Sequence, residues 1–354
     1  MKVVYGVAGE GLGHVFEAIE IIDRLRREGH AVKVLTFGER ACASLQAFGP
    51  TRIEGVHLYT NAKGFSLAAT FARNLRIFPF YLRHWRRLRR EIEAFEPDVF
   101  VTAYEPFTTL VAHVLRRPLI SMDNQNELLH LPPGGEPPTF ALRLVQLATR
   151  ICTYGADYYL VKSLAKPACH EPRVRFVSPI IQSRIRQLVP RDGAHVLVYL
   201  TKPNPDLIGV LRSLEETFFV YCHNRVGDEG NVHYRAQGEG FLRDLQDCKA
   251  IIGTTGFSLI SDSIYLRKPY FGVPLRKQFE QTHNARFLRN SGLGTSSETP
   301  TADELRRFLA GLPTYRERLA RYRLDPTEQE ETLLALLGAA ASGGRAAPVT
   351  AAFP

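Results

Sequence analysis

The first 37 residues alternate a strand, a glycine-rich loop, a helix and a second strand, and this order constrains the fold more than any other feature of the chain. Residues 3–7 form a short apolar run, and residues 16–25 carry apolar side chains at helical spacing. Gly29 ends the predicted helix, and residues 31–37 form a second apolar run. Strands joined by a helical crossover run parallel. The chain is therefore predicted to begin with the βαβ unit of a parallel sheet.

The same alternation recurs along the rest of the chain. Further strands are predicted at residues 98–102, 119–122 and 158–161, with helices at 83–95 and 108–115. A second series of strands is predicted at residues 195–200, 218–222, 232–234, 250–253 and 270–273. Because 354 residues exceed what one ordinary core accommodates, we predict an α/β protein of two Rossmann-like, doubly wound domains that face a cleft.

The domain boundaries follow from shifts in composition. Residues 178–193 contain two prolines, several arginines and little periodicity, which is typical of a linker. Beyond residue 337 the chain is mostly Ala, Gly, Ser and Pro, which favours disorder. The prediction is an N-terminal domain at 1–183, a linker at 184–193, a C-terminal domain at 194–320, a terminal helix at 321–337 and a disordered tail at 338–354.

The charge and the cysteines limit the classes of partner and compartment. The formal charge is +9, which favours anionic partners such as nucleotides, phosphorylated lipids or an anionic membrane surface. Nucleic acid is not expected, because the basic residues are scattered and no stacking-aromatic motif accompanies them. The five cysteines form no Cys-x-x-Cys pair, and no signal peptide or membrane-spanning run is found. We therefore expect a cytoplasmic protein without a disulfide framework or zinc site.

The glycine loop at residues 9–14, GEGLGH, joins the first strand to the first helix. Backbone amides at such a junction favour an anion, and an imidazole at His14 can accept a proton from a hydroxyl near neutral pH. Alternatively, His14 makes only a local hydrogen bond at the helix start. The loop departs from the dinucleotide fingerprint, although Glu39 at the end of the second strand keeps an NAD-binding alternative open.

The C-terminal half places a second strand-to-helix junction at residues 254–258, TTGFS, where amides and hydroxyls can hold a diphosphate. Asp262 follows Ser258 by four residues and shares its helix face, so an exposed carboxylate there can reach a ribose; the alternative is that it only complements the helix dipole. Glu280 and Gln281 can bind several sugar hydroxyls, or simply cap the next helix.

Together these residues resemble the GT-B glycosyltransferases over about 320 residues from Met1 onward. GEGLGHVFEA is similar to the amino-terminal glycine loop of the N-acetylglucosaminyltransferase that completes the lipid-linked peptidoglycan precursor. Residues 254–285 are similar to the donor signature of glucuronosyltransferase-like enzymes. The segments at 105–106 and 123–125 look like an uncharacterised bacterial and archaeal branch of that superfamily.

The resemblance implies a role for each matching residue. His14 takes the place of the acceptor-side catalytic histidine. From its charge, and not from the resemblance, Glu105 is expected to orient His14 and to stabilise its protonated form. The implied acceptor-side residues are Gly11, Gly13 and Asn124. The implied donor-binding residues are Thr255, Gly256, Phe257, Ser258, Asp262, Glu280, Gln281 and Lys202. Three positions depart from the pattern. Asp262 replaces the usual glutamate, Thr255 stands where many relatives have another residue, and residues 201–204 replace a glycine-rich loop, with Lys202 as the substitute positive charge.

The function expected from this resemblance is inverting transfer of a sugar from a nucleoside-diphosphate sugar, UDP-linked by resemblance, to an acceptor hydroxyl. The acceptor is a lipid or envelope precursor, or a soluble small molecule. No Asp-x-Asp motif occurs, so we expect neither a metal nor a cofactor. The alternatives are a sugar-nucleotide epimerase of the same fold and a noncatalytic nucleotide-sugar or nucleic-acid binding protein.

Residues 71–90 interleave apolar and aromatic side chains with seven arginines and contain no acid. Segments that combine apolar and basic side chains in this way bind well at an anionic membrane surface. The alternative is an ordinary amphipathic helix whose apolar face lies in the core and whose arginines lie in water. Pro79 is expected to break the stretch in two.

Overall fold

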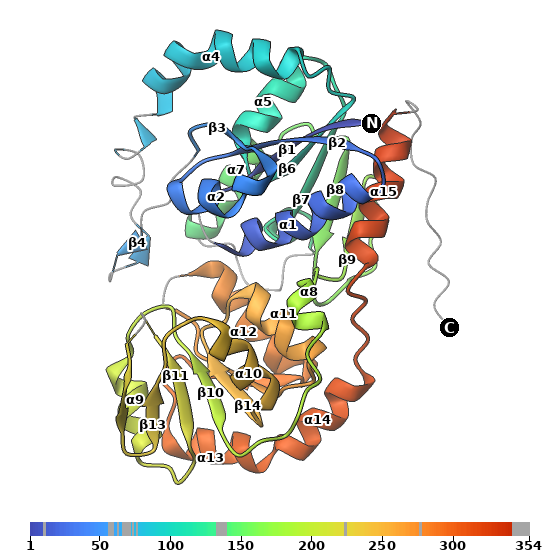
Figure 1. Ribbon diagram of the computed structural model, residues 1–354. Coiled ribbons are helices and arrows are strands. Elements are labelled where there is room, and N and C mark those ends of the chain that lie inside the picture. Colours follow the sequence, from blue (N-terminus) through green and yellow to red (C-terminus); the bar gives the residue numbers. More distant parts are fainter. Residues whose placement is uncertain are drawn as a thin grey trace. The chain divides into compact units, whose positions relative to one another are not determined.

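The computed structural model describes residues 1–9, 12–55, 60–61, 64–65, 72, 74–75, 77–131, 140–222, 225–275 and 278–341. The chain forms two compact units (Figure 1). Unit 1 comprises Met1–Ile180 and Asp325–Pro354, and unit 2 comprises Ile181–Leu324. Each unit is built on its own seven-stranded sheet, which is the two-domain α/β architecture that the sequence predicts.

The sheet of unit 1 is parallel throughout and has the order β3-β2-β1-β6-β7-β8-β9. In that order its strands are Thr51–Arg52, Ala31–Thr36, Lys2–Val7, Val99–Ala103, Leu119–Asp123, Tyr158–Lys162 and Val174–Val177. Its helices are α1 (Leu12–Arg27), α2 (Glu39–Ser44), the 3-10 turn η1 (Gln46–Phe48), α4 (Ile77–Glu93), α5 (Pro106–Val114), α6 (Glu127–His130), α7 (Phe140–Cys152) and α15 (Glu328–Ala341). A separate antiparallel pair joins β4 (Thr60–Asn61) to β5 (Gly64–Phe65).

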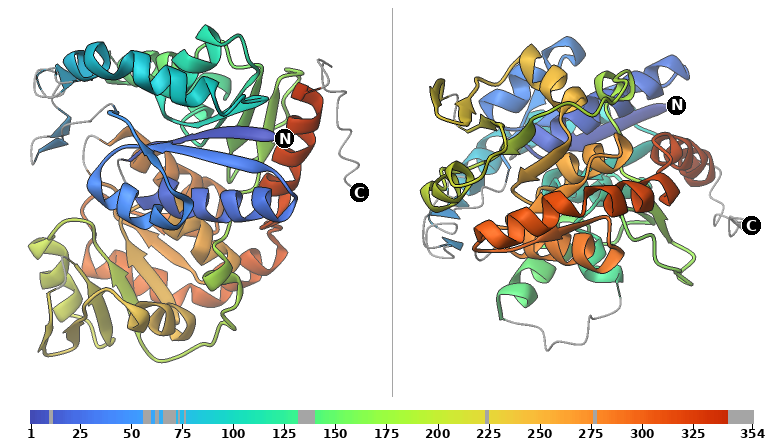
Figure 2. Two further views of the ribbon diagram at one scale, coloured as in Figure 1. Left: turned by 45° about the horizontal axis from the view of Figure 1, so that its top comes forward. Right: turned by 90° about the horizontal axis from the view of Figure 1, so that it is seen from below.

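Alternate side chains of the central strands build two apolar layers, as expected for a sheet covered on both faces. Val3, Tyr5 and Val7 of β1 pack with buried residues of α1 and α15. Val4 of the same strand packs with residues of α4 and α5 on the other face. The helix α15, at the red end of the chain, lies beside α1 although most of the sequence separates them (Figures 1 and 2).

The sheet of unit 2 has the order β12-β13-β11-β10-β14-β15-β16, with β12 the one antiparallel strand. In that order its strands are Gly227–Glu229, Val232–Tyr234, Phe218–Tyr221, Val196–Tyr199, Ala250–Gly253, Tyr270–Gly272 and Gly294–Ser296. Its helices are α8 (Ser183–Arg186), α9 (Pro205–Arg212), α10 (Glu239–Asp247), α11 (Phe257–Tyr265), α12 (Phe279–Ser291), α13 (Ala302–Ala310) and α14 (Leu312–Arg321). An apolar core joins this sheet to α9 and α13.

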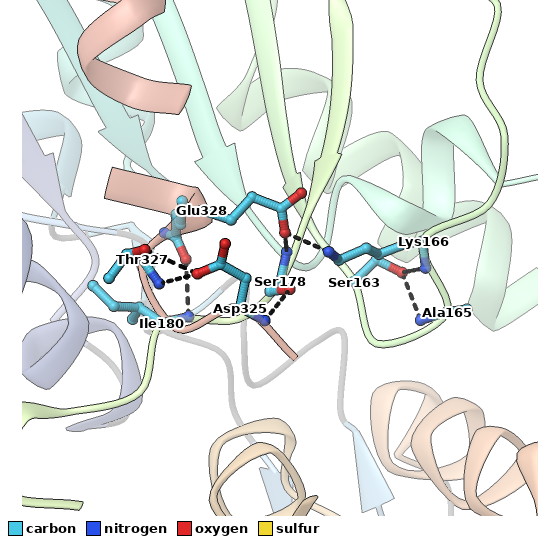
Figure 3. A network of polar contacts seen from close by, with 9 residues as sticks. Ser163, Ala165, Lys166, Ser178, Ile180, Asp325, Thr327 and Glu328 are labelled. Atoms are coloured by element: carbon cyan, nitrogen blue, oxygen red, sulfur yellow. Dashed lines mark hydrogen bonds and ion pairs between the residues drawn. The ribbon is translucent and has the colours of Figure 1, made fainter. Parts of the chain in front are cut away.

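The last helix, α15, belongs to unit 1, although the residues just before it belong to unit 2. The composition of the chain does not indicate this return. The helix spans Glu328–Ala341, later than the expected 321–337, and it includes the first four residues of the expected tail, whose remainder lies outside the described residues. A polar network fixes its start (Figure 3). Ser178 N donates to Glu328 Oε2 over 2.8 Å, and Lys166 pairs with the same carboxylate. Asp325 N donates to Ser178 Oγ over 3.2 Å. These bonds tie the end of the chain to the strands β8 and β9.

Pro79 does not break α4, which corrects the expectation from the sequence. The helix begins at Ile77, so Pro79 is its third residue. Amides in the first turn of a helix have no intrahelical acceptor, and proline loses nothing there. A helix of 17 residues therefore runs from Ile77 to Glu93 with Pro79 in its first turn. Phe71, Arg73 and Arg76 lie outside the described residues.

Candidate functional site

The expected acceptor-side residues gather at the carboxyl ends of the parallel strands of unit 1. His14 lies in the first turn of α1, directly after the loop that follows β1. Glu105 follows β6, and Asp123 is the last residue of β7. In doubly wound sheets, ligands bind outside this edge. The arrangement is what the sequence predicts for a site at this edge, although the chemical pairing of these residues differs from the expected one.

His14 is paired with Asp123. The distance from His14 Nδ1 to Asp123 Oδ2 is 3.6 Å, and the side chains are 15% and 0% exposed. The other carboxylate oxygen, Oδ1, accepts the backbone N–H of Gln125 over 2.8 Å. A carboxylate at Nδ1 leaves Nε2 for a substrate and stabilises the imidazolium that forms when the ring takes a proton. At 3.6 Å the two groups do not form a hydrogen bond, and the buried Nδ1 of His14 has no hydrogen-bond partner among the described residues. Asp123 is therefore placed to stabilise a protonated His14 by its charge.

Glu105 does not orient His14, and this corrects the sequence prediction. Its carboxylate caps α5: Oε1 accepts the N–H of Phe107 over 2.9 Å, and Oε2 accepts the N–H of Thr108 over 2.7 Å. The Thr108 hydroxyl also donates to Oε2, over 2.6 Å. Burial raises the pKa of Glu105, and these hydrogen bonds oppose the shift. An acid followed by proline is a helix-start signal, so the sequence of residues 105–106 already contained this structural explanation.

The remaining acceptor-side residues keep their predicted roles as hypotheses. Gly11 lies outside the described residues, and Gly13 is the second residue of α1. Asn124 is buried directly after Asp123, and its carbonyl accepts the N–H of Glu127. Gly9 is required sterically, because a Cβ there would lie 1.7 Å from the carbonyl oxygen of Phe37. Gly9 is thus packed closely against the residue that follows the second strand.

In unit 2, the expected donor-side residues follow three adjacent strands. Tyr199 of β10 pairs with Gly253 of β14, which in turn pairs with Gly272 of β15. The strand ends are therefore level, and the loops that follow them lie at one edge. These loops carry Lys202, the 254–258 segment, and Glu280 with Gln281 at the start of α12. The structure brings the predicted donor residues together along this edge.

The segment 254–258 leads into α11 with Gly256 as the N-cap and no side-chain hydrogen bond capping the helix. Gly256 has extended backbone angles, φ −70° and ψ 140°. A Cβ built on it would meet no heavy atom within 4 Å. Gly256 and Ser258 are both partly exposed. An open helix start with partly exposed small residues suits a diphosphate, which binds the amides and the positive end of the helix dipole.

Thr255 and Phe257 have internal roles instead of direct contact with a donor through their side chains, which corrects their assignment. Thr255 is fully buried, and its hydroxyl donates to the carbonyl of Gln281 over 2.7 Å. Its own carbonyl accepts from Asn284 Nδ2 over 3.0 Å. The Phe257 ring is buried in the core. These contacts hold the loop against α12, so only the main chain of the two residues remains for a donor.

Asp262 is nearly buried, with 9% of its surface exposed, and this corrects the expectation of an exposed carboxylate. Gln281 is equally buried, and its Oε1 accepts the N–H of Leu275 over 2.9 Å. Glu280 is exposed in the first turn of α12, and Lys202 is exposed in the loop between β10 and α9. Among the predicted donor residues, the exposed charges are therefore Glu280 and Lys202, whereas Asp262 and Gln281 lie deeper.

A pocket of about 350 Å³ opens between α9 and the ends of the neighbouring strands, and no motif in the sequence predicts it. Its lining includes the apolar side chains of Leu200, Ile208 and Cys222, and also Arg212 and Arg225. Both arginines pair with the carboxylate of Glu229. The residues at the start of α11 do not line this pocket.

Among the described residues, no group of three or more His, Cys, Asp or Glu side chains is placed to hold a metal ion. In the same ranges, no helix combines the length and the apolar character needed to cross a membrane. All five cysteines are unpaired.

Residues 1–313 match the protein-family model described as glycosyl transferase family 1. The chain belongs to this family. This assignment confirms the expected glycosyltransferase activity class and favours it over the epimerase, NAD-binding and noncatalytic alternatives. An uncharacterised glycosyltransferase of Methanosarcina acetivorans is 21% identical over 346 residues, covering 86% of this chain and 88% of the relative.

Solved glycosyltransferase structures share the fold of this enzyme. Spinosyn forosaminyltransferase superposes with a TM-score of 0.65 at 15% identity, covering 96% of this chain and 99% of that chain. Spinosyn rhamnosyltransferase complexed with thymidine diphosphate superposes with a TM-score of 0.62 at 14% identity, covering 95% and 100%. The predicted GT-B architecture is thereby confirmed. The specific likeness to the peptidoglycan enzyme stays a prediction.

Proposed function

We propose that this glycosyltransferase moves a sugar from a nucleoside-diphosphate sugar to an acceptor hydroxyl by a single displacement that inverts the anomeric carbon and uses no metal or cofactor. The observation that carries the proposal is the pairing of His14 with the buried Asp123 at the carboxyl edge of unit 1. His14 Nε2 takes the hydroxyl proton as the oxygen bonds to the anomeric carbon. The bond from that carbon to the diphosphate oxygen breaks, and the diphosphate leaves with the electron pair.

The donor binds at the edge of unit 2 where α11 begins. The amides near Gly256 stabilise the negative charge that grows on the departing diphosphate, which lowers the barrier more than it tightens ground-state binding. Lys202 supplies a cation at the neighbouring strand end. Glu280 and Gln281 at the start of α12 bind hydroxyls of the donor sugar, and Asp262 contacts the ribose from its buried position.

The nucleotide of the proposed donor is a pyrimidine, either uridine or thymidine. Uridine follows from the resemblance of residues 254–285 to the donor signature of glucuronosyltransferase-like enzymes. Thymidine is supported by the spinosyn rhamnosyltransferase, whose structure holds thymidine diphosphate.

Thermal unfolding with UDP-, dTDP-, GDP- and CDP-glucose separates these nucleotides. We expect UDP or dTDP sugars to raise Tm, with the same rise in EDTA. No rise with any of the four would contradict the proposed donor site.

The proposed acceptor is a lipid or envelope precursor, and α4 carries this part of the proposal. Tyr81 stacks on Phe107 with 4.6 Å between ring centroids, and Leu88 and Ile92 are buried, so one face of the helix lies in the core. Phe78 and Leu82 nevertheless remain 70% and 71% exposed. One face of α4 therefore packs in the core, as in an ordinary amphipathic helix. The same helix also exposes apolar side chains on its surface.

Arginines surround the exposed end of α4. Within the described chain, Arg89 pairs with Glu93, whereas Arg83, Arg86 and Arg90 form no ion pair. Each contributes about 1 kcal/mol near an anionic lipid surface. We propose that Phe78 and Leu82 insert into the headgroup boundary while the arginines bind anionic lipids, so that the cytoplasmic enzyme acts on an acceptor at the inner face of the membrane.

Flotation with vesicles tests this surface. We expect salt-sensitive binding to vesicles that contain phosphatidylglycerol and no binding to pure phosphatidylcholine. Replacing Arg83, Arg86, Arg87 and Arg90 with Gln should abolish binding, because the electrostatic attraction is lost. The control changes Arg306, Arg318 and Arg321 of unit 2 to Gln and should retain binding. If the wild-type protein fails to float with anionic vesicles at low salt, the acceptor is instead a soluble small molecule.

A further inference from the structure

Three helices of unit 1 expose apolar side chains to solvent, and so far only those of α4 have been given a role. The helices α4 and α5 cover the face of the sheet opposite α1 and α15, and α7 lies beside α5. Each of the three exposes one apolar pair spaced four residues apart, which places both members on the same side of the helix. The pairs are Phe78 with Leu82, Leu110 with Val114, and Leu147 with Ile151, and their exposed fractions lie between 39% and 71%.

Contacts between the helices place these pairs on neighbouring elements. Phe107 of α5 stacks on Tyr81 of α4 with 4.6 Å between ring centroids (Figure 1). Thr109, two residues further along α5, donates from its hydroxyl to the carbonyl of Cys152 at the end of α7 over 2.5 Å. Residues two apart on a helix point to different sides. The helix α5 therefore lies between α4 and α7, and the three apolar pairs belong to adjacent helices.

An exposed aromatic residue extends the same surface. Tyr154 follows α7 and is 71% exposed. Its ring lies edge-on to His113 of α5, with 5.6 Å between ring centroids, so it bridges the two helices. Tyrosine is favoured where one end of a side chain meets an apolar phase and the other end meets water. Soluble monomers rarely leave large contiguous apolar patches exposed, and such patches mark contacts with a protein or a membrane.

Exposed arginines accompany the apolar pairs of α5 and α7. Arg143 and Arg150 are exposed on α7, and the exposed Arg116 closely follows α5. Within the ranges that the structure describes, these three arginines form no ion pair. Neither α5 nor α7 contains an acid. Charge complementarity therefore favours an anionic partner for this surface.

An anionic bilayer fits the surface better than a second copy of the chain. Two copies related by a twofold axis would bring the same patch together, so their arginines would repel each other. At a bilayer, the apolar side chains enter the headgroup boundary while the arginines bind the anionic headgroups. The binding of such a surface grows with both the buried apolar area and the attraction to anionic lipids.

We propose that α4, α5 and α7 form one docking face for an anionic lipid bilayer, in which the exposed apolar pairs of α5 and α7 enter the headgroup boundary beside the pair of α4. This inference rests on the proposed membrane contact of α4 and extends it to two helices that have no role in the displacement. It also fixes the orientation of unit 1, because contact along three neighbouring helices turns the face opposite α15 toward the lipid.

Flotation with phosphatidylglycerol vesicles tests the pair of α7. Leu147→Gln combined with Ile151→Gln should lower the partition coefficient at least about tenfold, because two apolar side chains no longer enter the boundary. Both residues are exposed, so Tm should stay close to that of the wild type. The control combines Val189→Gln with Val226→Gln, which changes two exposed apolar residues of unit 2, and it should bind like the wild type.

Fluorescence quenching locates the contact independently. Trp85 is the single tryptophan of the chain, so Leu147→Trp adds one new emitter. Vesicles of brominated phosphatidylglycerol should quench this variant more strongly than the wild type, because the added ring enters the boundary. Val189→Trp places the ring at an exposed position of unit 2 and should show no added quenching.

The outcomes separate this docking face from the contact of α4 alone. Flotation of the α7 double variant equal to that of the wild type, or no added quenching of Leu147→Trp, would overturn the docking face and leave the α4 contact standing. A wild-type protein that fails to float with anionic vesicles at low salt would remove the membrane contact of all three helices. If sedimentation shows a wild-type dimer that the α7 double variant converts to a monomer, with flotation unchanged, the face binds a second copy and the proposal is wrong.

Discussion

Replacement of His14 by alanine is expected to lower kcat at least about a hundredfold, the usual size of losing a general base. The reason is that the acceptor hydroxyl loses the imidazole that lies beside the buried Asp123. Donor affinity should remain nearly unchanged, because the proposed donor residues belong to unit 2 and His14 belongs to unit 1. Turnover at saturating acceptor and calorimetric titration of the donor measure the two effects separately.

Two companion variants sharpen this test. Asp123→Asn keeps the shape of the side chain and removes its charge, so kcat should fall at least about tenfold while the fold is retained. His170→Ala removes an exposed histidine of the same unit and should behave like the wild type. Near-normal turnover of His14→Ala would remove the residue from the mechanism.

Replacement of Gly256 by valine is expected to weaken donor binding at least about tenfold, which corresponds to roughly 1.4 kcal/mol. The extended angles at this N-cap accept a branched residue, and a Cβ there meets no heavy atom within 4 Å, so the fold should be unaffected. The added methyl groups would instead occupy the space in which a diphosphate approaches the amides of α11.

Gly209→Val is the matched control for this variant. Gly209 lies in α9, is exposed, and its Cβ also meets nothing within 4 Å. Both variants should unfold at nearly the wild-type temperature, and only Gly256→Val should lose affinity for the nucleotide sugar in calorimetric titration. Equal affinity of the two variants would show that the diphosphate binds elsewhere.

The two-unit α/β fold could be predicted because its signals are local. Each central strand is a short apolar run next to a helix with apolar spacing, and the positions of β1, β2, β6, β7 and β8 in unit 1 follow this pattern closely. The return of α15 to unit 1 could not be predicted in this way. Its contacts, such as those of Glu328 with Ser178 and Lys166, join segments about 150 residues apart.

The site residues also differ in whether a local sequence signal marks them. The sequence singles out His14 and Gly256 as candidates because they sit at strand-to-helix junctions, which it marks with glycines. The pairing of His14 with Asp123 was missed because it depends on the order of strands in the sheet, in which β6 separates β1 from β7. The burial of Asp262 was missed because helix spacing gives the face on which a residue lies and not the depth of what covers it.

The configuration of the transferred sugar is the most direct test of the proposed mechanism. Proton magnetic resonance of the wild-type reaction, started with an α-linked UDP- or dTDP-glucose and a hydroxyl acceptor, reports the anomeric coupling of the first product formed. A single displacement driven by His14 predicts a β-linked product, with one nucleoside diphosphate released for each sugar transferred. An α-linked product, or release of epimerised free sugar without acceptor, would contradict it.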